Sequence, residues 1–362
     1  MRPKFHALRV AEVRRETKDC VSIAFQIPAE HKDVYQFKHG QYLTLRAFIN
    51  GEDLRRSYSI CSGIGETPLR VAVKEVDDGI FSSWVSHHLK AGDEIQVMTP
   101  TGHFTTELNS TAKKNYLLVA AGSGITPIIS IAKSVLKTEQ QSEVTLIFGN
   151  RWFNSIIFRE ELEDLKDRYF GRFRLFHVLS AEPNDLELFH GRIDREKLEG
   201  FSQSFIDFKH TDEVFVCGPE PMIHAVKDFA TEMGIAKENI HFELFTTPEQ
   251  AALIAAKPAE EKRQTSEKIC HVTIVLDGVE TKFNMPVQGA AILDAAQAHG
   301  LDIPFSCKGG MCCTCRAHLS KGTVEMDVNY ALEPGEVEAG FILTCQSHPT
   351  SDSVLVNYDK QN

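Results

Sequence analysis

The chain has 362 residues, too many for one ordinary hydrophobic core, and this length predicts two or three domains. Hydrophobic residues make up 42% of it and charged residues 25%, which is typical of a globular protein and argues against a wholly disordered one. The formal net charge of −11 argues against nucleic acid or an anionic membrane surface as the main partner, so we expect neither.

The first part of the chain predicts short β-strands. In residues 21–27, apolar side chains alternate with smaller or polar ones, which is the period of two of a half-buried strand. Turn sequences separate this segment from further candidate strands at 41–49, 69–76 and 93–100. Several such strands in one stretch indicate an antiparallel β-barrel domain over residues 1–110.

From residue 115 the pattern changes to apolar strands that alternate with helices. Strands are expected within 115–124, 143–151, 174–180 and 213–219, and helical patterns at 127–137, 158–169 and 221–234. The first of these helices is expected to begin at Pro127, where the missing N–H costs nothing. This alternation predicts a doubly wound α/β domain with a parallel sheet over residues 111–246.

The remainder of the chain predicts a linker and a third domain. Residues 247–267 are rich in Ala, Glu and Lys and contain few large apolar side chains, so we interpret them as a linker. Residues 268–362 begin with a predicted hairpin around Asp277-Gly278, followed by a short helix at 290–299.

Cysteine spacing is the most specific signal in the sequence. No apolar stretch resembles a secretory signal or reaches the length of a membrane span, so we expect a cytoplasmic protein, in which clustered cysteines indicate metal or redox chemistry. Of nine cysteines, four follow the order Cys307-x4-Cys312-x2-Cys315, then 29 residues, then Cys345. This is the plant-type [2Fe–2S] spacing. Structural zinc is the alternative, but zinc sites usually pair cysteines in C-x2–4-C knuckles.

The cysteine segment resembles the plant-type ferredoxins. That resemblance implies a β-grasp α+β fold over about 270–357, with Cys307, Cys312, Cys315 and Cys345 as the iron ligands. Cys313 is then a spare thiol, because adjacent residues of a tight loop cannot both point at the same iron, and Cys270 is expected to be an ordinary buried residue.

Four short motifs in the first domain resemble the flavin domain of the ferredoxin–NADP reductase family. They are His39-Gly40-Gln41-Tyr42, Arg56-Ser57-Tyr58-Ser59, Gly79-x-x-Ser82 and Gly102-His103-Phe104, in this order. The resemblance implies that FAD is bound, with Arg56 on the pyrophosphate, Tyr58 over the isoalloxazine ring and Ser59 near its N5 atom. The full set of flavin-binding residues that it implies is Arg56, Ser57, Tyr58, Ser59, Val73, Gly79, Phe81 and Ser82.

Two motifs in the second domain indicate a nicotinamide nucleotide. A glycine turn, 122–127, follows an apolar strand and opens a helix, the context that places a pyrophosphate at a helix N-terminus. The second motif, Cys217-Gly218-Pro219 with Met222, again resembles the reductase family. That resemblance implies that Cys217 lies near the reactive carbon of the nicotinamide and that Phe245 packs against the flavin. The residues expected to bind the nucleotide are Gly122, Gly124, Thr126, Pro127, Arg151, Cys217, Gly218, Pro219 and Met222.

The choice between NADPH and NADH stays open at this point. Arg151, Ser180 and Arg192 are candidates to meet a 2′-phosphate, and no acidic residue ends the second strand, which favours NADPH. Glu182 weakens this interpretation, because ferredoxin–NADP reductases usually have an arginine after the serine.

The complete chain resembles the reductase subunits of phenylacetyl-CoA epoxidases (phenylacetate-CoA oxygenases). The segments that carry this resemblance include LRRSYSICS, VAVKEVDDGIFS, AAGSGITP, HGRID, CKGGMCCTC and NYALEP. The resemblance implies an oxidoreductase that passes electrons from NAD(P)H through FAD and the [2Fe–2S] cluster to a diiron oxygenase, with Ser59, Cys217 and Phe245 at the reacting ring. Two alternatives stay open: a free-standing oxidoreductase for another acceptor, and a redox-sensing iron–sulfur binding protein.

Overall fold

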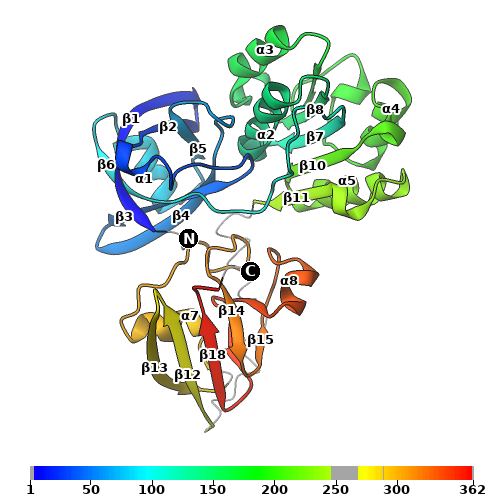
Figure 1. Ribbon diagram of the computed structural model, residues 1–362. Coiled ribbons are helices and arrows are strands. Elements are labelled where there is room, and N and C mark those ends of the chain that lie inside the picture. The colour runs from blue at the N-terminus through cyan, green and yellow to red at the C-terminus, as the bar shows by residue number, and fades with distance from the viewer. Residues whose placement is uncertain (1–3, 246–267, 288, 361–362) are drawn as a thin grey trace. The chain divides into compact units, whose positions relative to one another are not determined.

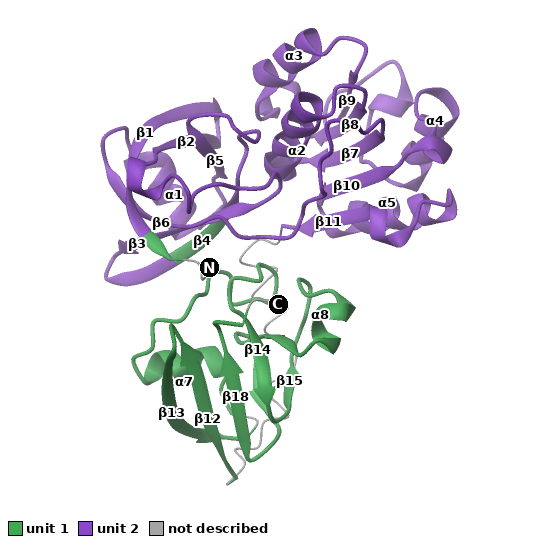
Figure 2. Ribbon diagram, viewed as in Figure 1, with its two compact units in different colours: residues 1–5, 55–57, 246–362 green, residues 6–54, 58–245 purple. Residues whose placement is uncertain are grey.

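The computed structural model describes residues 4–245, 268–287 and 289–360, so the predicted linker at 247–267 lies outside the described residues. Contacts between Cα atoms divide the chain into two compact units (Figure 2). One comprises Met1–Phe5, Arg55–Ser57 and Thr246–Asn362, and the other comprises His6–Leu54 and Tyr58–Phe245. No helix in the described ranges is long and apolar enough to cross a membrane.

The first part of the chain forms a six-stranded antiparallel sheet in the order β4-β3-β6-β1-β2-β5 (Figure 1). The elements are β1 (Phe5–Thr17), β2 (Cys20–Gln26), β3 (Tyr42–Ile49), β4 (Glu52–Ser59), β5 (Leu69–Lys74), α1 (Ile80–His88) and β6 (Glu94–Met98). An isolated bridge between Ile60 and Val71 joins the ends of the two edge strands and closes the sheet into a barrel. The strands predicted at 21–27, 41–49, 69–76 and 93–100 are confirmed, with ends that shift by one or two residues.

Strand β2 differs from the sequence expectation in one respect that matters for the site. It was expected to be half-buried, but its residues from Cys20 to Phe25 are all buried. Val21, Ile23 and Phe25 face the barrel core, whereas Cys20 joins a second core made mostly of residues from the following α/β part. The barrel therefore has no solvent-exposed face at this strand, because the next part of the chain covers it.

Residues 115–244 form a five-stranded parallel sheet in the order β11-β10-β7-β8-β9. The strands are β7 (Asn115–Ala121), β8 (Glu143–Asn150), β9 (Phe173–Leu179), β10 (Glu213–Gly218) and β11 (Ile240–Leu244), and the helices are α2 (Ile125–Thr138), α3 (Arg159–Arg168), α4 (Arg195–Ser204) and α5 (Glu220–Glu232). Alternate residues of β7 enter two different cores, one with α2 and α3 and one with α4 and α5. The sheet is therefore covered on both faces, as the apolar runs predicted.

Helix α2 begins earlier than the sequence suggested. Its first residue is Ile125, so Pro127 is the third helical residue instead of the first. Pro127 still lies among the first four residues, whose N–H groups have no partner within a helix, and its missing N–H costs no intrahelical bond. The helix is buried on nearly all sides, from Ile125 to Leu136.

The other unit contains a five-stranded mixed sheet in the order β13-β12-β18-β14-β16 and a two-stranded β15-β17 pair. Its elements are β12 (Ile269–Leu276), β13 (Val279–Pro286), α7 (Ile292–Ala298), β14 (Arg316–Lys321), β15 (Val324–Met326), α8 (Pro334–Glu338), β16 (Phe341–Leu343), β17 (Ser347–Pro349) and β18 (Ser353–Asn357). The predicted hairpin is confirmed, because Leu276 and Val279 are register partners across Asp277-Gly278. Cys270 is fully buried in the core beneath this sheet, as expected of an ordinary core residue.

The contact between the turns after β7 and β10 gives a stability prediction. A Cβ atom on Gly124 would lie 2.2 Å from the carbonyl oxygen of Cys217, which is main chain and cannot rotate away. We expect Gly124→Ala to destabilise this part of the chain by about 1–3 kcal/mol, the usual cost of overpacking. Chemical denaturation of the full-length protein measures the change.

The matched control is Gly335→Ala in helix α8, where an added Cβ meets nothing within 4 Å. This control should be neutral or slightly stabilising. Equal unfolding midpoints for Gly124→Ala and the unchanged chain would show that the two turns separate without cost.

Candidate functional site

The carboxyl ends of β7 and β10 form the crevice of the parallel sheet. The chain proceeds from β7 to β8 in one direction and reaches β10 on the other side, so the strand order reverses between these two strands. Such a reversal is where doubly wound sheets bind their ligands. The two motifs that the sequence assigned to the nucleotide, 122–127 and 217–222, both begin at this point.

Glycines allow the two motifs to touch. In addition to the close approach of Gly124 to Cys217, a Cβ on Gly218 would lie 2.6 Å from Cε of Met222 and 3.1 Å from Cβ of Ala121. Gly122 has a φ of +54° and would meet nothing within 4 Å, so its side of the turn is open. An open turn at the N-terminus of α2 suits a phosphate, which supports the predicted nucleotide site.

A half-buried acid lies beside Cys217. Glu243 is the register partner of Cys217 on the neighbouring strand β11, and its carboxylate accepts a hydrogen bond of 3.2 Å from the Ser59 hydroxyl. Burial raises the pKa of Glu243 to about 8, although the Ser59 hydrogen bond acts in the opposite direction. Burial also raises the pKa of the Cys217 thiol well above its usual value, and Glu243 adds to the effect. The structure thus groups two predicted catalytic residues with a third side chain that holds a proton near neutral pH.

Sequence reasoning did not single out Glu243 as a functional residue. Its contact with Ser59 joins residues 184 positions apart, which no local pattern reveals. The available signal is a carboxylate near the end of the short strand β11, two residues before Phe245. Phe245 itself packs against the core shared by α2 and the barrel, so its position next to the flavin stays a prediction.

The predicted flavin residues lie on three neighbouring segments of the barrel. Tyr58 at the end of β4 stacks on Phe81 of α1, with 6.1 Å between ring centroids. Phe81 and Val73 belong to the barrel core, so Val73 can meet a ligand only through its main chain. The bridge that closes the barrel brings the end of β4 next to β5, where Val73 lies.

The turn before α1 needs glycine. A Cβ on Gly79 would lie 2.5 Å from Oγ of Ser82 and 2.9 Å from the carbonyl oxygen of Val76. The Ser82 hydroxyl donates to the Gly79 carbonyl and accepts from the Val76 amide, so it also stabilises the turn. These contacts fit an anion-binding turn, whereas direct phosphate contacts of Arg56, Ser57 and Ser82 stay predictions.

The region expected to meet the adenosine end of the nucleotide lies at the ends of β8 and β9. The Ala181 amide donates to the Arg151 carbonyl at 2.9 Å, and the Glu182 carboxylate accepts from the Phe153 amide at 3.0 Å. Arg151 and Glu182 therefore bring opposite charges to the same strand ends.

The four cysteines of the plant-type spacing meet as two pairs in the structure. The sulfurs of Cys307 and Cys312 interact by hydrogen bonding, and those of Cys315 and Cys345 do the same. Within the described part of the chain, no three His, Cys, Asp or Glu side chains are placed to hold one common metal ion. Two pairs of thiols are the donor set that a binuclear iron cluster requires, so the residues fit the expected cofactor.

The loop favours thiolates at the two outer cysteines. The pKa of Cys307 is lowered to about 6 by the hydrogen bond with Cys312 and by the amides of Gly309, Met311 and Cys312. A hydrogen bond with Cys315 is the largest cause that lowers the pKa of Cys345, and the Gly310 amide adds to it. The same two hydrogen bonds raise the pKa of Cys312 and Cys315, so one thiol of each pair holds the proton. Thiolates are the form that ligates iron, and amides directed at sulfur stabilise their charge. The spare Cys313 instead directs its thiol to the carbonyl of Ala331 at 3.2 Å.

Gln346 is a further residue of this site that the sequence did not reveal. It is 8% exposed, and its amide nitrogen donates to the carbonyl oxygens of Lys308 at 2.8 Å and Cys345 at 2.9 Å. Because both neighbours are carbonyl acceptors, the amide group can have only one orientation. The same nitrogen then lies 3.6 Å from the Cys345 sulfur, so the side chain ties the cysteine loop to the fourth thiol and donates to it.

Substitution of Gln346 should change the electronic environment of the cluster. An N–H donor near a ligand sulfur stabilises the more negative, reduced cluster, so we expect Gln346→Met to lower the reduction potential by tens of millivolts. A potentiometric titration followed by electron paramagnetic resonance measures this shift. The control is Gln297→Met, which removes a bond to the Lys308 side chain at 2.9 Å without touching a thiol. Equal potentials for the two variants would contradict the assignment.

The raised pKa of Glu243 predicts a pH-dependent stability. The folded chain holds the proton up to pH about 8, above the ordinary glutamate value of 4.5. The folded state therefore binds more protons than the unfolded state in this range, so stability falls as pH rises and becomes level above it. Glu243→Gln should remove this dependence, which amounts to roughly 2–4 kcal/mol.

Denaturation of the FAD-loaded protein at several pH values between about 5 and 9 measures the effect. The exposed Glu238, replaced by Gln, is the control and should leave the slope unchanged. A parallel pH profile for Glu243→Gln and the unchanged chain would refute the raised pKa.

Three family models match the chain in succession. "Oxidoreductase FAD-binding domain" matches residues 7–106, "Oxidoreductase NAD-binding domain" matches 118–228, and "2Fe-2S iron-sulfur cluster binding domain" matches 274–350. The cofactors expected from the sequence, FAD, a nicotinamide nucleotide and a [2Fe–2S] cluster, are those of the matched domains, and the chain is an oxidoreductase.

A solved structure shares the fold. Phthalate dioxygenase reductase, described as a modular structure for electron transfer from pyridine nucleotides to [2Fe–2S], aligns with a TM-score of 0.59 and 24% identity over 98% of both chains. This confirms the predicted multidomain architecture of a β-barrel, a parallel α/β sheet and a ferredoxin-type α+β part.

Two relatives extend over nearly the whole chain. The reductase component of 3-ketosteroid-9-alpha-monooxygenase from Mycobacterium tuberculosis is 35% identical over 98% of this chain and 96% of its own length. One of the subunits of 1,2-phenylacetyl-CoA epoxidase from Escherichia coli is 41% identical over 98% of both chains. The chain therefore belongs to the family of oxygenase reductases, with FAD-, NAD- and [2Fe–2S]-binding domains, that includes this component of the epoxidase.

Proposed function

We propose that this chain supplies electrons from NADPH to a diiron oxygenase that acts on phenylacetyl-CoA. The observation that carries the choice of acceptor is the 41% identity to the Escherichia coli component of 1,2-phenylacetyl-CoA epoxidase over 98% of both chains. Relatives named for ketosteroid and glycine betaine monooxygenases are 35% and 31% identical. They support the general role of an oxygenase reductase, but their lower identity favours their own acceptors less than the epoxidase.

Each cofactor is assigned a part of the chain. Residues 1–110 hold FAD, 111–246 hold the nucleotide, and 268–362 hold the cluster, with Cys307, Cys312, Cys315 and Cys345 as ligands. FAD, when bound, takes up two electrons from NAD(P)H as a hydride and releases them singly, which is what a one-electron [2Fe–2S] cluster requires. The chain itself binds these cofactors, orients them and excludes water from them.

The protein groups at the crevice have distinct roles in this proposal. The turn at Gly122–Pro127 binds the nucleotide phosphates at the N-terminus of α2. Cys217, which is fully buried, excludes water beside the nicotinamide. Glu243 and the Ser59 hydroxyl share a hydrogen bond, so a proton is held next to the predicted position of the flavin N5 atom.

Arg151 is assigned to the 2′-phosphate of NADPH. The support is its place at the end of β8, where the chain has no acidic residue to accept from a 2′-hydroxyl. Glu182, whose carboxylate accepts from the Phe153 amide, argues against this assignment because its negative charge would repel a 2′-phosphate. The same proposal places the protein in the cytoplasm, where its thiols stay reduced.

The decisive experiment combines the purified chain with purified phenylacetyl-CoA epoxidase oxygenase subunits. We expect NADPH oxidation coupled to consumption of phenylacetyl-CoA, with flavin, iron and acid-labile sulfide in the chain. Cys345→Ser should abolish electron transfer to the oxygenase and to cytochrome c, with flavin reduction by NADPH intact. Cys313→Ser, the change at the spare thiol, is the control and should retain transfer.

Each other outcome selects another interpretation. Cytochrome c reduction without coupling to the epoxidase would indicate a different acceptor. No oxidation of NADPH or NADH would favour a redox-sensing protein, and zinc in place of iron would overturn the cluster assignment.

A further inference from the structure

One face of helix α2 carries polar side chains and is nevertheless largely buried. Ser130, Lys133, Ser134 and Lys137 follow one another at the spacing i, i+3, i+4, i+7, which places them in a single row along the helix. Ser130 and Ser134 are fully buried and Lys133 is 8% exposed. We call these four residues the α2 stripe.

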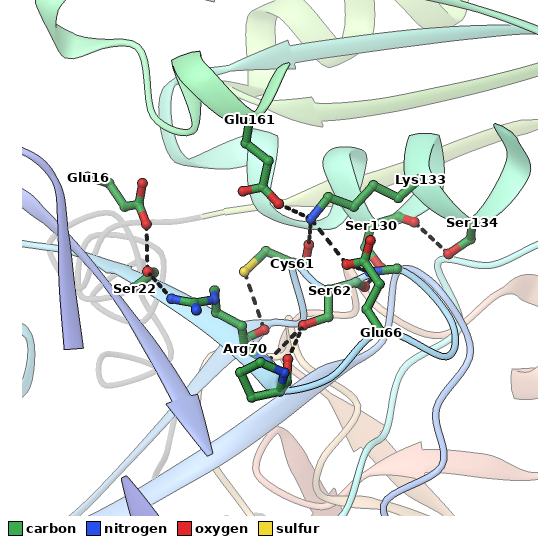
Figure 3. Close-up of polar contacts among 12 residues, drawn as sticks. Glu16, Ser22, Cys61, Ser62, Glu66, Arg70, Ser130, Lys133, Ser134 and Glu161 are labelled. Atoms are coloured by element: carbon green, nitrogen blue, oxygen red, sulfur yellow. Dashed lines mark hydrogen bonds and ion pairs between the residues drawn. The ribbon is translucent and has the colours of Figure 1, made fainter. Parts of the chain in front are cut away.

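The stripe binds the main chain of the barrel segment 61–64. Ser130 Oγ donates to the Ser62 carbonyl at 2.7 Å, and Lys133 Nζ donates to the Cys61 carbonyl at 3.2 Å (Figure 3). Ser134 Oγ accepts from the Ile64 amide at 3.0 Å, and Lys137 Nζ donates to the Ile64 carbonyl at 3.1 Å. Every member of the row is therefore hydrogen-bonded to this one segment.

Lys133 is also held by two carboxylates from different parts of the unit. Its ammonium group pairs with Glu66 at 3.3 Å and with Glu161 of α3, as Figure 3 shows. Burial disfavours the charge of Lys133, but the two carboxylates outweigh it and hold its pKa above the ordinary value. Removal of the ammonium would break both ion pairs at once, although Glu161 would keep its pair with Arg14 at 3.7 Å and Glu66 would keep the Gly63 amide.

Segment 61–64 lies so close to helix α2 that only glycine fits at position 63. A Cβ on Gly63 would lie 2.8 Å from Cβ of Lys133. The Gly63 amide in turn donates to Glu66 at 2.8 Å, so the same carboxylate binds both the loop and the lysine. Main chain, loop carboxylate and helix lysine thus form one connected network.

This network joins the two elements that lead to the binding segments of the reaction. Helix α2 begins at the turn assigned to the nucleotide phosphates, and segment 61–64 begins two residues after Ser59, which with Tyr58 is assigned to the flavin ring. The stripe therefore connects the nucleotide helix to the flavin strand over a few residues. Hydride transfer depends steeply on such placement, because a misplacement of about 1 Å can cost about 100-fold in rate.

We propose that the α2 stripe, with Lys133 at its centre, is the positioning device that sets the nicotinamide against the flavin ring. This inference rests on the proposed function of the two binding segments. Lys133 is a positioning residue, since it contacts only protein groups. Its loss should slow flavin reduction at saturating NADPH while leaving nucleotide affinity and the cluster unchanged.

The test uses the full-length protein with its cofactors. Lys133→Met removes the charge. The double change Ser130→Ala with Ser134→Ala removes two hydrogen bonds to segment 61–64 without leaving a buried charge, which guards against a variant that fails to fold. Stopped-flow absorbance measures the rate of flavin reduction against NADPH concentration. Hydrogen exchange of residues 61–66 reports the contact itself, independently of activity.

We expect a fall of about 10- to 100-fold in the limiting rate for Lys133→Met, a smaller fall for the double variant, and faster exchange at 61–66 in both. The control is Lys166→Met, which breaks the exposed pair of Lys166 with Glu163 at 3.5 Å and should change neither quantity. Reduction of the cluster by dithionite should be equal in all variants.

Two results would overturn the inference: an unchanged limiting rate in Lys133→Met, or slower reduction without faster exchange at 61–66. Failure of the proposed function is distinguishable, because the unchanged protein would then not be reduced by NADPH or NADH at all.

Discussion

The close contact of two main-chain turns governs the α/β part of the protein. Where β7 and β10 end, Gly124 and Cys217 approach so closely that not even a methyl group fits between them. This contact places a glycine turn, a buried thiol and the N-terminus of α2 at one point, although the residues are far apart in the chain. The chemistry assigned to the crevice depends on this approach, because phosphate and nicotinamide must be bound by neighbouring turns at the same time.

Buried charge is the second organising feature. Globular proteins rarely bury Lys or Glu unless these are paired or neutralised. Both solutions occur here: Lys133 is charged and paired with two carboxylates, whereas Glu243 avoids its charge by keeping a proton. Pairing, as at Lys133, suits a fixed contact between elements. Protonation, as at Glu243, suits a group that must exchange a proton at neutral pH. The cysteine loop adds a third solution, in which main-chain amides stabilise negative sulfur.

The sequence predicted the features that local spacing encodes. The cysteine spacing predicted thiols that meet, and they do so as two pairs. Apolar periodicity predicted four strands of the barrel and four of the parallel sheet, but not β4 or β11. The 13-residue strand β1 was not foreseen, since only three of its residues are buried and five are charged, so it lacks the alternation of a typical strand. The contact of Ser59 with Glu243 and the α2 stripe were equally hidden. In each case a polar residue acquires its role from a partner more than sixty positions away, and nothing near it in the chain records that partner.

The burial of both faces of β2 also bears on how such reductases are assembled from parts. A domain that is covered by its neighbour has an outer surface suited only to that neighbour, so the barrel cannot act as an interchangeable cassette. Cys20 would lose its cover if the chain were cut after residue 110, and the main-chain groups of Cys61 and Ser62 would lose their partners on α2. The flavin and nicotinamide parts therefore share one hydrophobic core and form a single structural piece.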